Sequence, residues 1–372
     1  MTDNASSEKR FLVLDGISGV PLGHDITESL RTEGYIANHF DCLRLPSRLF
    51  HGARSACAKA IARLSTGMEF NYLPRLRLKE LHPVFTTTMP THILVIGFIY
   101  KFFDLAELRH LANEHQATLM LYDTDSCNLF ARRREFIYFI EQELPIYDHV
   151  FSFSRVTTNF FLQVRKLNAS YLPFGANPIT LPDVRQKDID VLFIGSGDLR
   201  RIFLLEHIRN YVMVFGNRWQ RYRPLISREL WANISDQPVW GDELHRLLAR
   251  SKIVLNITRA DFHGMETGIN LRIFEAVAAG CFLLTDHCDE IEDLFEVGKE
   301  IETYQSSREL ADKVRFYLEN ETKRTDIAQN GYAKILEHHI WCKRIRQMFF
   351  YSVPRHLATQ NILIKKDGHG RN

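Results

Sequence analysis

Hydrophobic residues along the chain alternate between short apolar runs and segments in which apolar residues recur at helical spacing. The runs are bounded by Gly, Asp or Pro, a pattern typical of strands buried on both faces of a parallel sheet. They predict strands at 11–15, 35–40, 92–97, 117–122, 148–153, 169–175, 190–194, 211–215, 252–257, 282–285 and 300–304. Helical segments separate them, so the sequence predicts a doubly wound α/β sheet in each half.

A proline-rich segment separates the two halves. Pro173, Pro178 and Pro182 disfavour both a helix and a central strand there, which predicts a stiff linker with the boundary near Leu181. We therefore expect one domain over residues 1–180 and a second over 181–340.

Composition and charge narrow the class of protein. The chain has 372 residues, 45% of them hydrophobic, and a net charge of +2. No apolar run reaches the roughly 18 residues of a membrane helix, and residues 1–10 lack the apolar core of a signal peptide. The six cysteines show no Cys-x-x-Cys spacing, which favours reduced thiols in the cytoplasm over a structural zinc site.

The segment 268–286 has the clearest local pattern. Apolar residues at helical spacing are followed by Gly280, where a helix end needs positive φ, and then by a short apolar strand. Gly268 allows a close backbone approach, and Asn270 either caps the helix or contacts a ligand. Arg272 lies one turn inside the helix. Free amides and a nearby guanidinium predict an anion site, with a phosphate as the expected ligand.

These residues also resemble a known family. The pattern is similar to the second-domain signature of the CgeB-like glycosyltransferases, relatives of the group 1 (family 4-like) enzymes, and it reads Asn270-x-Arg272-x-Phe274-Glu275-Ala276-x-Ala278-x-Gly280-x-x-Leu283-Leu284-x-Asp286. Further matches extend the resemblance from about Asp190 to His339. The first half matches only loosely.

The resemblance implies a GT-B fold, with two Rossmann-like domains that face each other across a cleft. It implies that residues 341–372 cross back to the first domain, with Trp341 and 348–351 as the docking face. The implied reaction is glycosyl transfer from a nucleoside-diphosphate sugar, UDP-sugars favoured, to a hydroxyl of a glycan, lipid-linked or protein acceptor. No metal or other cofactor is expected, and retention of configuration is favoured over inversion.

Three loops of the second domain are expected to bind the donor. Arg272 would neutralise the leaving diphosphate, and Glu275 would accept hydrogen bonds from the ribose hydroxyls. Trp240 lies near the expected nucleobase, although a core position is the alternative. The predicted nucleotide and diphosphate contacts are Gly195, Ser196, Gly197, Arg200, Arg201, Trp240, Gly268, Ile269, Asn270, Arg272 and Glu275.

The loop 258–267, expected to be irregular, should line the sugar pocket. His263, Glu266 and Thr267 are its candidate contacts. Family 4-like enzymes have a second acid eight positions before the ribose-binding Glu, and this chain has Thr267 there. The donor sugar and the stereochemistry therefore stay open.

In the first domain, an inverting mechanism would need an acceptor base, for which the candidates are His24, Asp15 and Asp123. For His24 and Asp25, a helix cap with a solvated His is favoured over a base, and Asp123-x-Asp125 can equally cap the helix that follows rather than act as a base or bind a metal. The stretch 44–79 has eight Lys or Arg residues and one acid, which suits either a solvated helix face or peripheral contact with the inner face of a membrane.

Other function classes are weaker matches. A sugar-nucleotide 2-epimerase shares the GT-B fold, and a non-catalytic sugar-nucleotide-binding or coat protein would retain the donor site. An NAD-dependent dehydrogenase is disfavoured because the first strand–loop–helix lacks Gly-x-Gly-x-x-Gly. Little supports nucleic-acid binding. The pathway is open, with bacterial surface polysaccharide or protein glycosylation favoured.

Overall fold

The computed structural model describes residues 9–17, 20–64, 73–126 and 132–352. Its framework is two six-stranded sheets in which every pairing is parallel. The first sheet has the order β2-β1-β3-β4-β5-β6, built from β1 (Arg10–Asp15), β2 (Ile36–Asp41), β3 (His92–Ile96), β4 (Thr118–Asp123), β5 (His149–Ser152) and β6 (Ala169–Tyr171). The second has the order β12-β11-β10-β7-β8-β9, built from β7 (Ile189–Ile194), β8 (Val212–Phe215), β9 (Ile234–Ser235), β10 (Ser251–Asn256), β11 (Leu283–Asp286) and β12 (Glu302–Tyr304).

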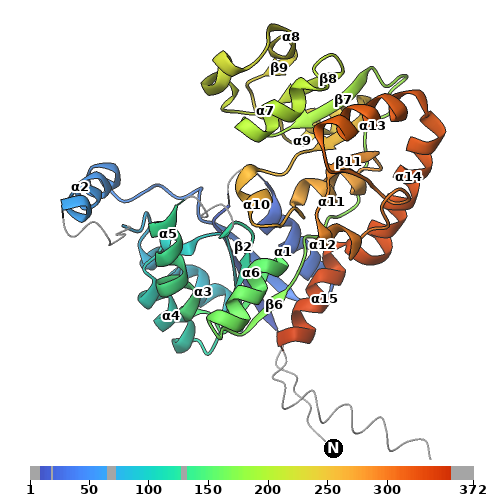
Figure 1. The fold of residues 1–372 in the computed structure, drawn as a ribbon. Coiled ribbons are helices and arrows are strands. Elements are labelled where there is room, and N and C mark those ends of the chain that lie inside the picture. Colours follow the sequence, from blue (N-terminus) through green and yellow to red (C-terminus); the bar gives the residue numbers. More distant parts are fainter. Residues whose placement is uncertain (1–8, 18–19, 65–72, 127–131, 353–372) are drawn as a thin grey trace, which may run out of the picture.

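Helices cover both sheets (Figure 1). The α-helices are α1 (Leu22–Thr32), α2 (His51–Leu64), α3 (His82–Thr88), α4 (Leu105–Glu114), α5 (Arg133–Tyr138), α6 (Arg155–Asn159), α7 (Leu199–Glu206), α8 (Arg228–Trp231), α9 (Gly241–Arg250), α10 (Ala260–Gly264), α11 (Leu271–Ala278), α12 (Asp289–Glu292), α13 (Ser307–Glu319), α14 (Glu321–Lys334) and α15 (Trp341–Ser352). Shorter 3-10 and π segments are η1 (Leu78–Glu80), η2 (Ile99–Lys101), η4 (Phe139–Glu143), η5 (Leu144–Ile146), η6 (Phe160–Val164), η7 (Trp219–Leu225) and η8 (Ile335–His339).

The strands form where the apolar runs predict them. The residues of β1 from Phe11 to Asp15 are all buried, as are the four residues of β11. Continuous burial of this kind requires cover on both faces, which the crossover helices supply. The prediction of a parallel α/β sheet in each half is therefore confirmed.

The strand orders fix where ligands can bind. In the first sheet the order reverses between β1 and β3, and in the second between β7 and β10. At such switch points the following loops diverge, which leaves a crevice at the carboxyl ends of the strands. The predicted boundary near Leu181 falls in the segment that joins β6 to β7.

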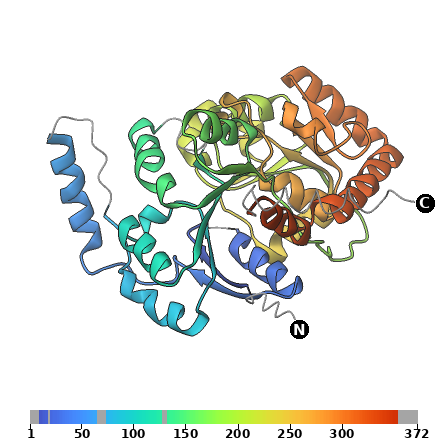
Figure 2. The same ribbon diagram turned by 90° about the horizontal axis from the view of Figure 1, so that it is seen from below.

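The last helix returns to the first half, as expected for residues from 341 onward. Figure 2 shows α15 beside the first-domain helix α1. Phe349 packs on Phe11 and Tyr35 with ring centroids 5.3 and 4.8 Å away, and Arg346 forms an ion pair with Glu33. The far end of this segment, from residue 353, lies outside the described residues.

One local expectation is wrong. The loop 258–267, which we expected to be irregular, contains the short helix α10. In the described residues, no helix is long and apolar enough to cross a membrane.

Gly280 ends α11 in the left-handed conformation that the sequence predicts, with φ of 69°. The amides of Gly280 and Cys281 donate to the carbonyls of Val277 and Ala276, which closes the helix in a Schellman motif. A Cβ at Gly280 would meet nothing within 4 Å. The glycine is therefore required by backbone conformation and not by space.

We expect Gly280→Ala to lower the free energy of unfolding by about 1 kcal/mol, because an L side chain disfavours positive φ. Urea denaturation measures the change. Gly52→Ala in α2 is the matched control, since its Cβ also meets nothing within 4 Å and its φ is not in the left-handed region. An equal effect in both variants would contradict the explanation.

Candidate functional site

A cleft of about 470 Å³ lies where the two sheets turn their carboxyl ends toward each other. From the first domain it is lined by Ile17, Val20, Leu22, Thr124, Asp125, Phe153 and Phe174. From the second domain it is lined mainly by the loops after β7, β8 and β10 and by the start of α11, including Gly195, Ser196, Arg201, Asn217, Arg218, Trp240, Thr258, Arg259, Phe262, Asn270, Leu271, Arg272 and Glu275.

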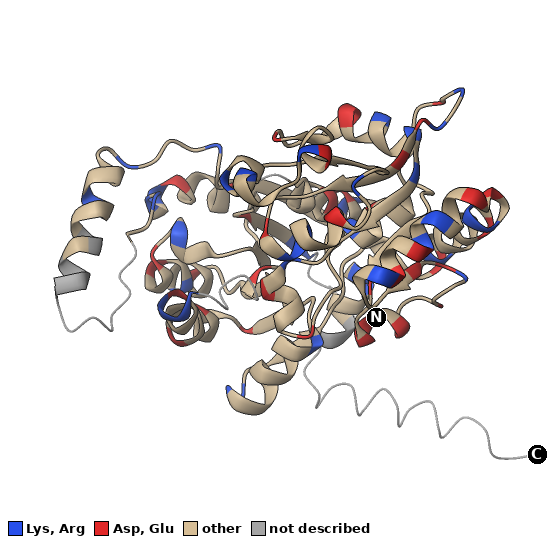
Figure 3. Ribbon diagram, turned by 45° about the horizontal axis from the view of Figure 1, so that its top comes forward, with Lys and Arg blue, Asp and Glu red and all other residues tan. Residues whose placement is uncertain are grey.

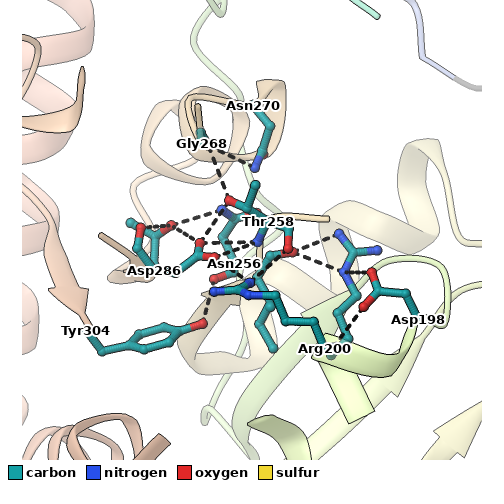
Figure 4. A network of polar contacts seen from close by, with 11 residues as sticks. Asp198, Arg200, Asn256, Thr258, Gly268, Asn270, Asp286 and Tyr304 are labelled. Carbon is teal, nitrogen blue, oxygen red and sulfur yellow. Dashed lines mark hydrogen bonds and ion pairs between the residues drawn. The ribbon is translucent and has the colours of Figure 1, made fainter. Parts of the chain in front are cut away.

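Asp286, at the end of β11, fixes the loops of the second domain (Figure 4). Its buried carboxylate accepts hydrogen bonds from the Thr258 amide at 3.1 and 3.0 Å and from the Thr258 hydroxyl at 2.9 Å. Arg200 Nη1 lies 2.7 Å from Oδ2 of Asp286 and donates to the Thr258 carbonyl at 2.9 Å. One acid thus holds the loop after β10 and the first turn of α7 together.

Arg201 also connects the loops after β7 and β10. Its guanidinium donates to the carbonyl of Ser196 at 2.8 Å and twice to the carbonyl of Ile257, at 3.1 and 2.7 Å. Both predicted phosphate-binding arginines therefore have donors engaged within the protein, and of the two only Arg201 lines the cleft. Their contacts here brace the loops on which a ligand would rest.

The small turn 195–197 follows β7, as the sequence predicts, and places Gly195 and Ser196 at the cleft. The amides of Gly195 and Gly197 donate to the carbonyls of Phe215 and Asn217, both at 2.8 Å. These two amides hold the turn against the neighbouring strand. Gly197 would clash mildly with Trp219 if it had a side chain, since a Cβ would lie 3.2 Å from the tryptophan.

The start of α11 presents the two charged residues that the sequence singled out. Asn270 accepts from the Arg272 amide at 3.1 Å, so it caps the helix. Arg272 Nη1 lies 2.9 Å from Oε2 of Glu275, one turn further on, and both side chains line the cleft. Within the described residues, Nη1 of Arg272 is buried, and its contact with Glu275 is an ion pair that lacks the geometry of a hydrogen bond.

The remaining residues of this segment face inward. Ile269 is fully buried in the core, and a Cβ on Gly268 would lie 2.9 Å from Sγ of Cys288. Close packing therefore requires the glycine. Any contact of these two residues with a ligand would have to come from the backbone.

A second cavity, of about 610 Å³, adjoins the cleft behind Arg272 and Glu275. Five residues line both spaces: Val20, Trp240, Leu271, Arg272 and Glu275. The rest of the second cavity's wall is largely apolar and includes Pro21, Ala176, Pro178, Ile179, Leu244, Leu248 and Trp341. Trp240 keeps 49% of its surface exposed, so it is not a core residue.

Asp25 of α1 reaches this second cavity from the first domain. Burial raises the pKa of its carboxyl to about 6; His24 works against this shift and Glu275 adds to it. Glu275 acts on Asp25 although the two residues belong to different domains. An acid of each domain therefore faces the same space.

The predicted sugar loop is only partly at the cleft. Thr258, Arg259 and Phe262 line it, whereas His263 and Glu266 are exposed outside its lining. Thr267 is buried, and its hydroxyl donates to Glu290 at 3.0 Å. Because helix α10 forms in this segment, these side chains lie away from the cleft. An irregular loop, as the sequence predicts here, does not indicate this arrangement.

Glu290 joins the two domains on this side. Its other carboxylate oxygen accepts from the amide of Arg155 at 2.6 Å, the first residue of α6 in the first domain. The Arg155 guanidinium also pairs with Asp293 at 3.0 Å. A carboxylate of the second domain thus caps a helix of the first.

The three candidate bases are not at the cleft surface. Asp15 is buried and accepts from the Ile17 amide and from His39, and His24 is exposed on α1. Asp123 is fully buried, and burial raises the pKa of its carboxyl. Asp125, two residues further on, lines the cleft instead. The roles assigned to these residues stay predictions.

Comparison with known proteins gives a partial sequence match. Residues 200–349 match the model of a family described as glycosyl transferase-like. A search of curated proteins found no match.

Solved structures resemble the whole chain. Sucrose-phosphate synthase from Thermosynechococcus elongatus superposes with a TM-score of 0.60 at 12% identity, covering 95% of this chain and 100% of that one. HepE from Anabaena, in complex with UDP and glucose, gives 0.58 at 13% identity over 91% and 98%. TarM from S. aureus, in complex with Fondaparinux, alpha-GlcNAc-glycerol and UDP, gives 0.53 at 13% over 74% and 58%. The predicted GT-B fold, two Rossmann-like domains across a cleft, is thereby confirmed.

Asp286 provides a test of the loop arrangement. We expect Asp286→Asn to lower the free energy of unfolding by about 3 kcal/mol, because it leaves the part-buried Arg200 without its counter-charge and turns an amide group toward the Thr258 amide. Chemical denaturation measures this change. Asp190→Asn is the control, since its pair with Lys252 is partly exposed to solvent and should contribute less than about 1 kcal/mol.

Asp25 provides a pH test. Because its folded pKa lies above the ordinary 3.8, the folded state keeps this proton longer, and the stability it contributes is lost as pH rises through about 6. Between about pH 4 and pH 7.5 we expect wild type to lose roughly 1 kcal/mol relative to Asp25→Asn, after allowance for solvent screening. Parallel pH profiles of stability for the two proteins would contradict this placement.

Proposed function

We propose that the protein is a glycosyltransferase that moves a sugar from a nucleoside-diphosphate sugar, UDP-sugars favoured, to an acceptor hydroxyl. The observation that carries the proposal is the pair of Arg272 and Glu275 at the start of α11, which lines both the interdomain cleft and the cavity behind it. The partial family match and the GT-B fold agree with it.

The chemistry of the two spaces suits the parts of such a donor. A diphosphate would lie at the α11 N-terminus near Arg272, where helix amides and a planar guanidinium favour phosphate oxygens. Glu275 would then accept from the ribose hydroxyls. The apolar cavity beside Trp240 has the size and walls to take the nucleobase.

Charge at the cleft is arranged for departure of the diphosphate. Cleavage of the glycosidic bond to phosphate builds negative charge on the leaving group, and preorganised positive groups stabilise that charge. Arg201, Arg218, Arg259 and Arg272 all line the cleft from the second domain. These positive side chains can thus stabilise the leaving diphosphate without a metal ion. A reaction with retention of configuration needs no protein base.

For the subfamily, the pathway and the cellular location we follow the sequence. We favour a CgeB-like enzyme of bacterial polysaccharide or protein glycosylation, acting in the cytoplasm on a glycan, lipid-linked or protein acceptor. Helix α2 projects from the body in Figure 1, and no acidic position is drawn along it in Figure 3. Leu49 and Phe50, just before it, are 81% and 80% exposed. These features support peripheral contact with an anionic membrane surface.

The donor site is tested by nucleotide binding. At a concentration about one hundred times its dissociation constant, UDP should stabilise the wild type by about 2.7 kcal/mol, seen as a rise of a few degrees in Tm. Glu275→Gln should weaken UDP binding at least tenfold. The neutral amide has one acceptor oxygen, whereas the charged carboxylate has two that can accept from the ribose hydroxyls.

Glu319→Gln is the control, because this glutamate is exposed at the end of α13, and it should bind UDP like wild type. GDP, TDP, CMP and NAD serve as competing ligands in the same assay. Stabilisation by NAD alone, or by no nucleotide, would refute the proposed donor site.

A further inference from the structure

The two walls of the cleft differ in chemical character. The second-domain wall holds four arginines, whereas the first-domain wall consists of Ile17, Val20, Leu22, Phe153 and Phe174 with Thr124 and Asp125. Among the described residues that line the cleft, the first domain contributes no lysine or arginine.

Aromatic side chains form the apolar surroundings of this part of the cleft. The rings of Phe153 and Phe174 have centroids 5.1 Å apart, and Phe262 of the second domain lies 5.7 Å from Phe153. All three are buried, so they make this wall apolar, and an apolar environment disfavours any charge placed against it. A phosphorylated compound here would meet Asp125 and no counter-charge from this wall.

Thr124 indicates which chemical group of a ligand the first-domain wall binds. The residue lines the cleft with 7% of its surface exposed, and its buried hydroxyl has no hydrogen-bond partner among the residues that the structure describes. Leaving a buried polar group without a partner is unfavourable, so such a group in a binding cleft indicates a partner supplied by a ligand.

Asp123 holds Thr124 and Asp125 in place. Its carboxylate accepts from the amides of Asp125 and Ser126 at 3.3 and 2.9 Å and from the hydroxyls of Ser126 and Ser152 at 2.6 and 2.9 Å. The turn that presents Thr124 and Asp125 is therefore fixed before a ligand arrives.

We propose that the acceptor is an uncharged hydroxyl compound with an apolar face, and that its reacting hydroxyl is bound by Thr124 and Asp125. This inference rests on the proposed glycosyl transfer. In that reaction the bond from the sugar C1 to the phosphate oxygen breaks, and its electrons leave with the nucleoside diphosphate. A bond from C1 to the acceptor oxygen forms, and the hydroxyl proton passes to the leaving phosphate oxygen.

The first arm of the test compares acceptors. The full-length protein receives the nucleotide sugar that binds best, together with octyl β-D-glucopyranoside, 4-nitrophenyl β-D-glucopyranoside or glucose 6-phosphate, and released nucleoside diphosphate is measured. We expect kcat/KM for the two uncharged glucosides to exceed that for glucose 6-phosphate at least tenfold. Equal or better use of the phosphate would overturn the proposal.

The second arm tests Thr124. Thr124→Val keeps the shape and removes the hydroxyl, so the KM for the glucoside should rise about tenfold, the loss expected for one hydrogen bond. The variant should melt no lower than wild type, because it removes a buried hydroxyl that has no partner among the described residues, so a higher KM would not reflect a folding defect. Thr87→Val, on the exposed face of α3, should change none of these values.

The outcomes separate this inference from the proposed function. Donor turnover with an unchanged glucoside KM in Thr124→Val would refute the role of Thr124 and leave glycosyl transfer intact. No turnover of any nucleotide sugar, even to water, would refute the proposed function and this inference with it.

Discussion

The geometry of the second-domain wall of the cleft depends on one buried carboxylate. Asp286 accepts from the amide and the hydroxyl of Thr258 and pairs with Arg200, so it fixes the loop after β10 to the first turn of α7. Arg201 adds a second connection, between Ser196 and Ile257. Because both arginines are used in this way, the loops are rigid before a ligand binds, and preorganised dipoles are what stabilise a developing charge without reorganisation.

The two domains contribute different chemistry to the space between them. The second domain brings arginines and the α11 N-terminus, which suit a diphosphate, while the first brings apolar side chains and a turn fixed by Asp123. Contacts at two places hold these walls opposite each other. Glu290 reaches from the second domain to the Arg155 amide, and α15 packs on the first domain. Relative domain position therefore determines whether the two halves of the site act together.

The sequence predicts those features that depend on neighbours along the chain. The apolar runs and the left-handed Gly280 are local, and the structure has them as expected. Of the two roles left open for Asn270, the structure shows the helix cap. The polar residues were harder to assign, because their role depends on partners far away in sequence. In the sequence, Arg200 is a candidate phosphate contact and Asp123 a candidate acceptor base. In the structure, Arg200 pairs with Asp286, and Asp123 accepts from the hydroxyls of Ser126 and Ser152. Asp125 follows β4 and lines the cleft, and Asp25 lies on α1 and lines the neighbouring cavity. Their positions depend on the directions of β4 and α1 in the fold, which local sequence does not determine.

Product analysis of a single reaction tests the central claim most directly. The purified protein is incubated with a panel of nucleoside-diphosphate sugars and an uncharged glucoside, and the nucleoside diphosphate and all sugar products are quantified by mass spectrometry. Glycosyl transfer predicts one nucleoside diphosphate released for each new glycosidic bond on the glucoside. An epimerised sugar without a glycosylated product, or no release from any donor, would contradict the account.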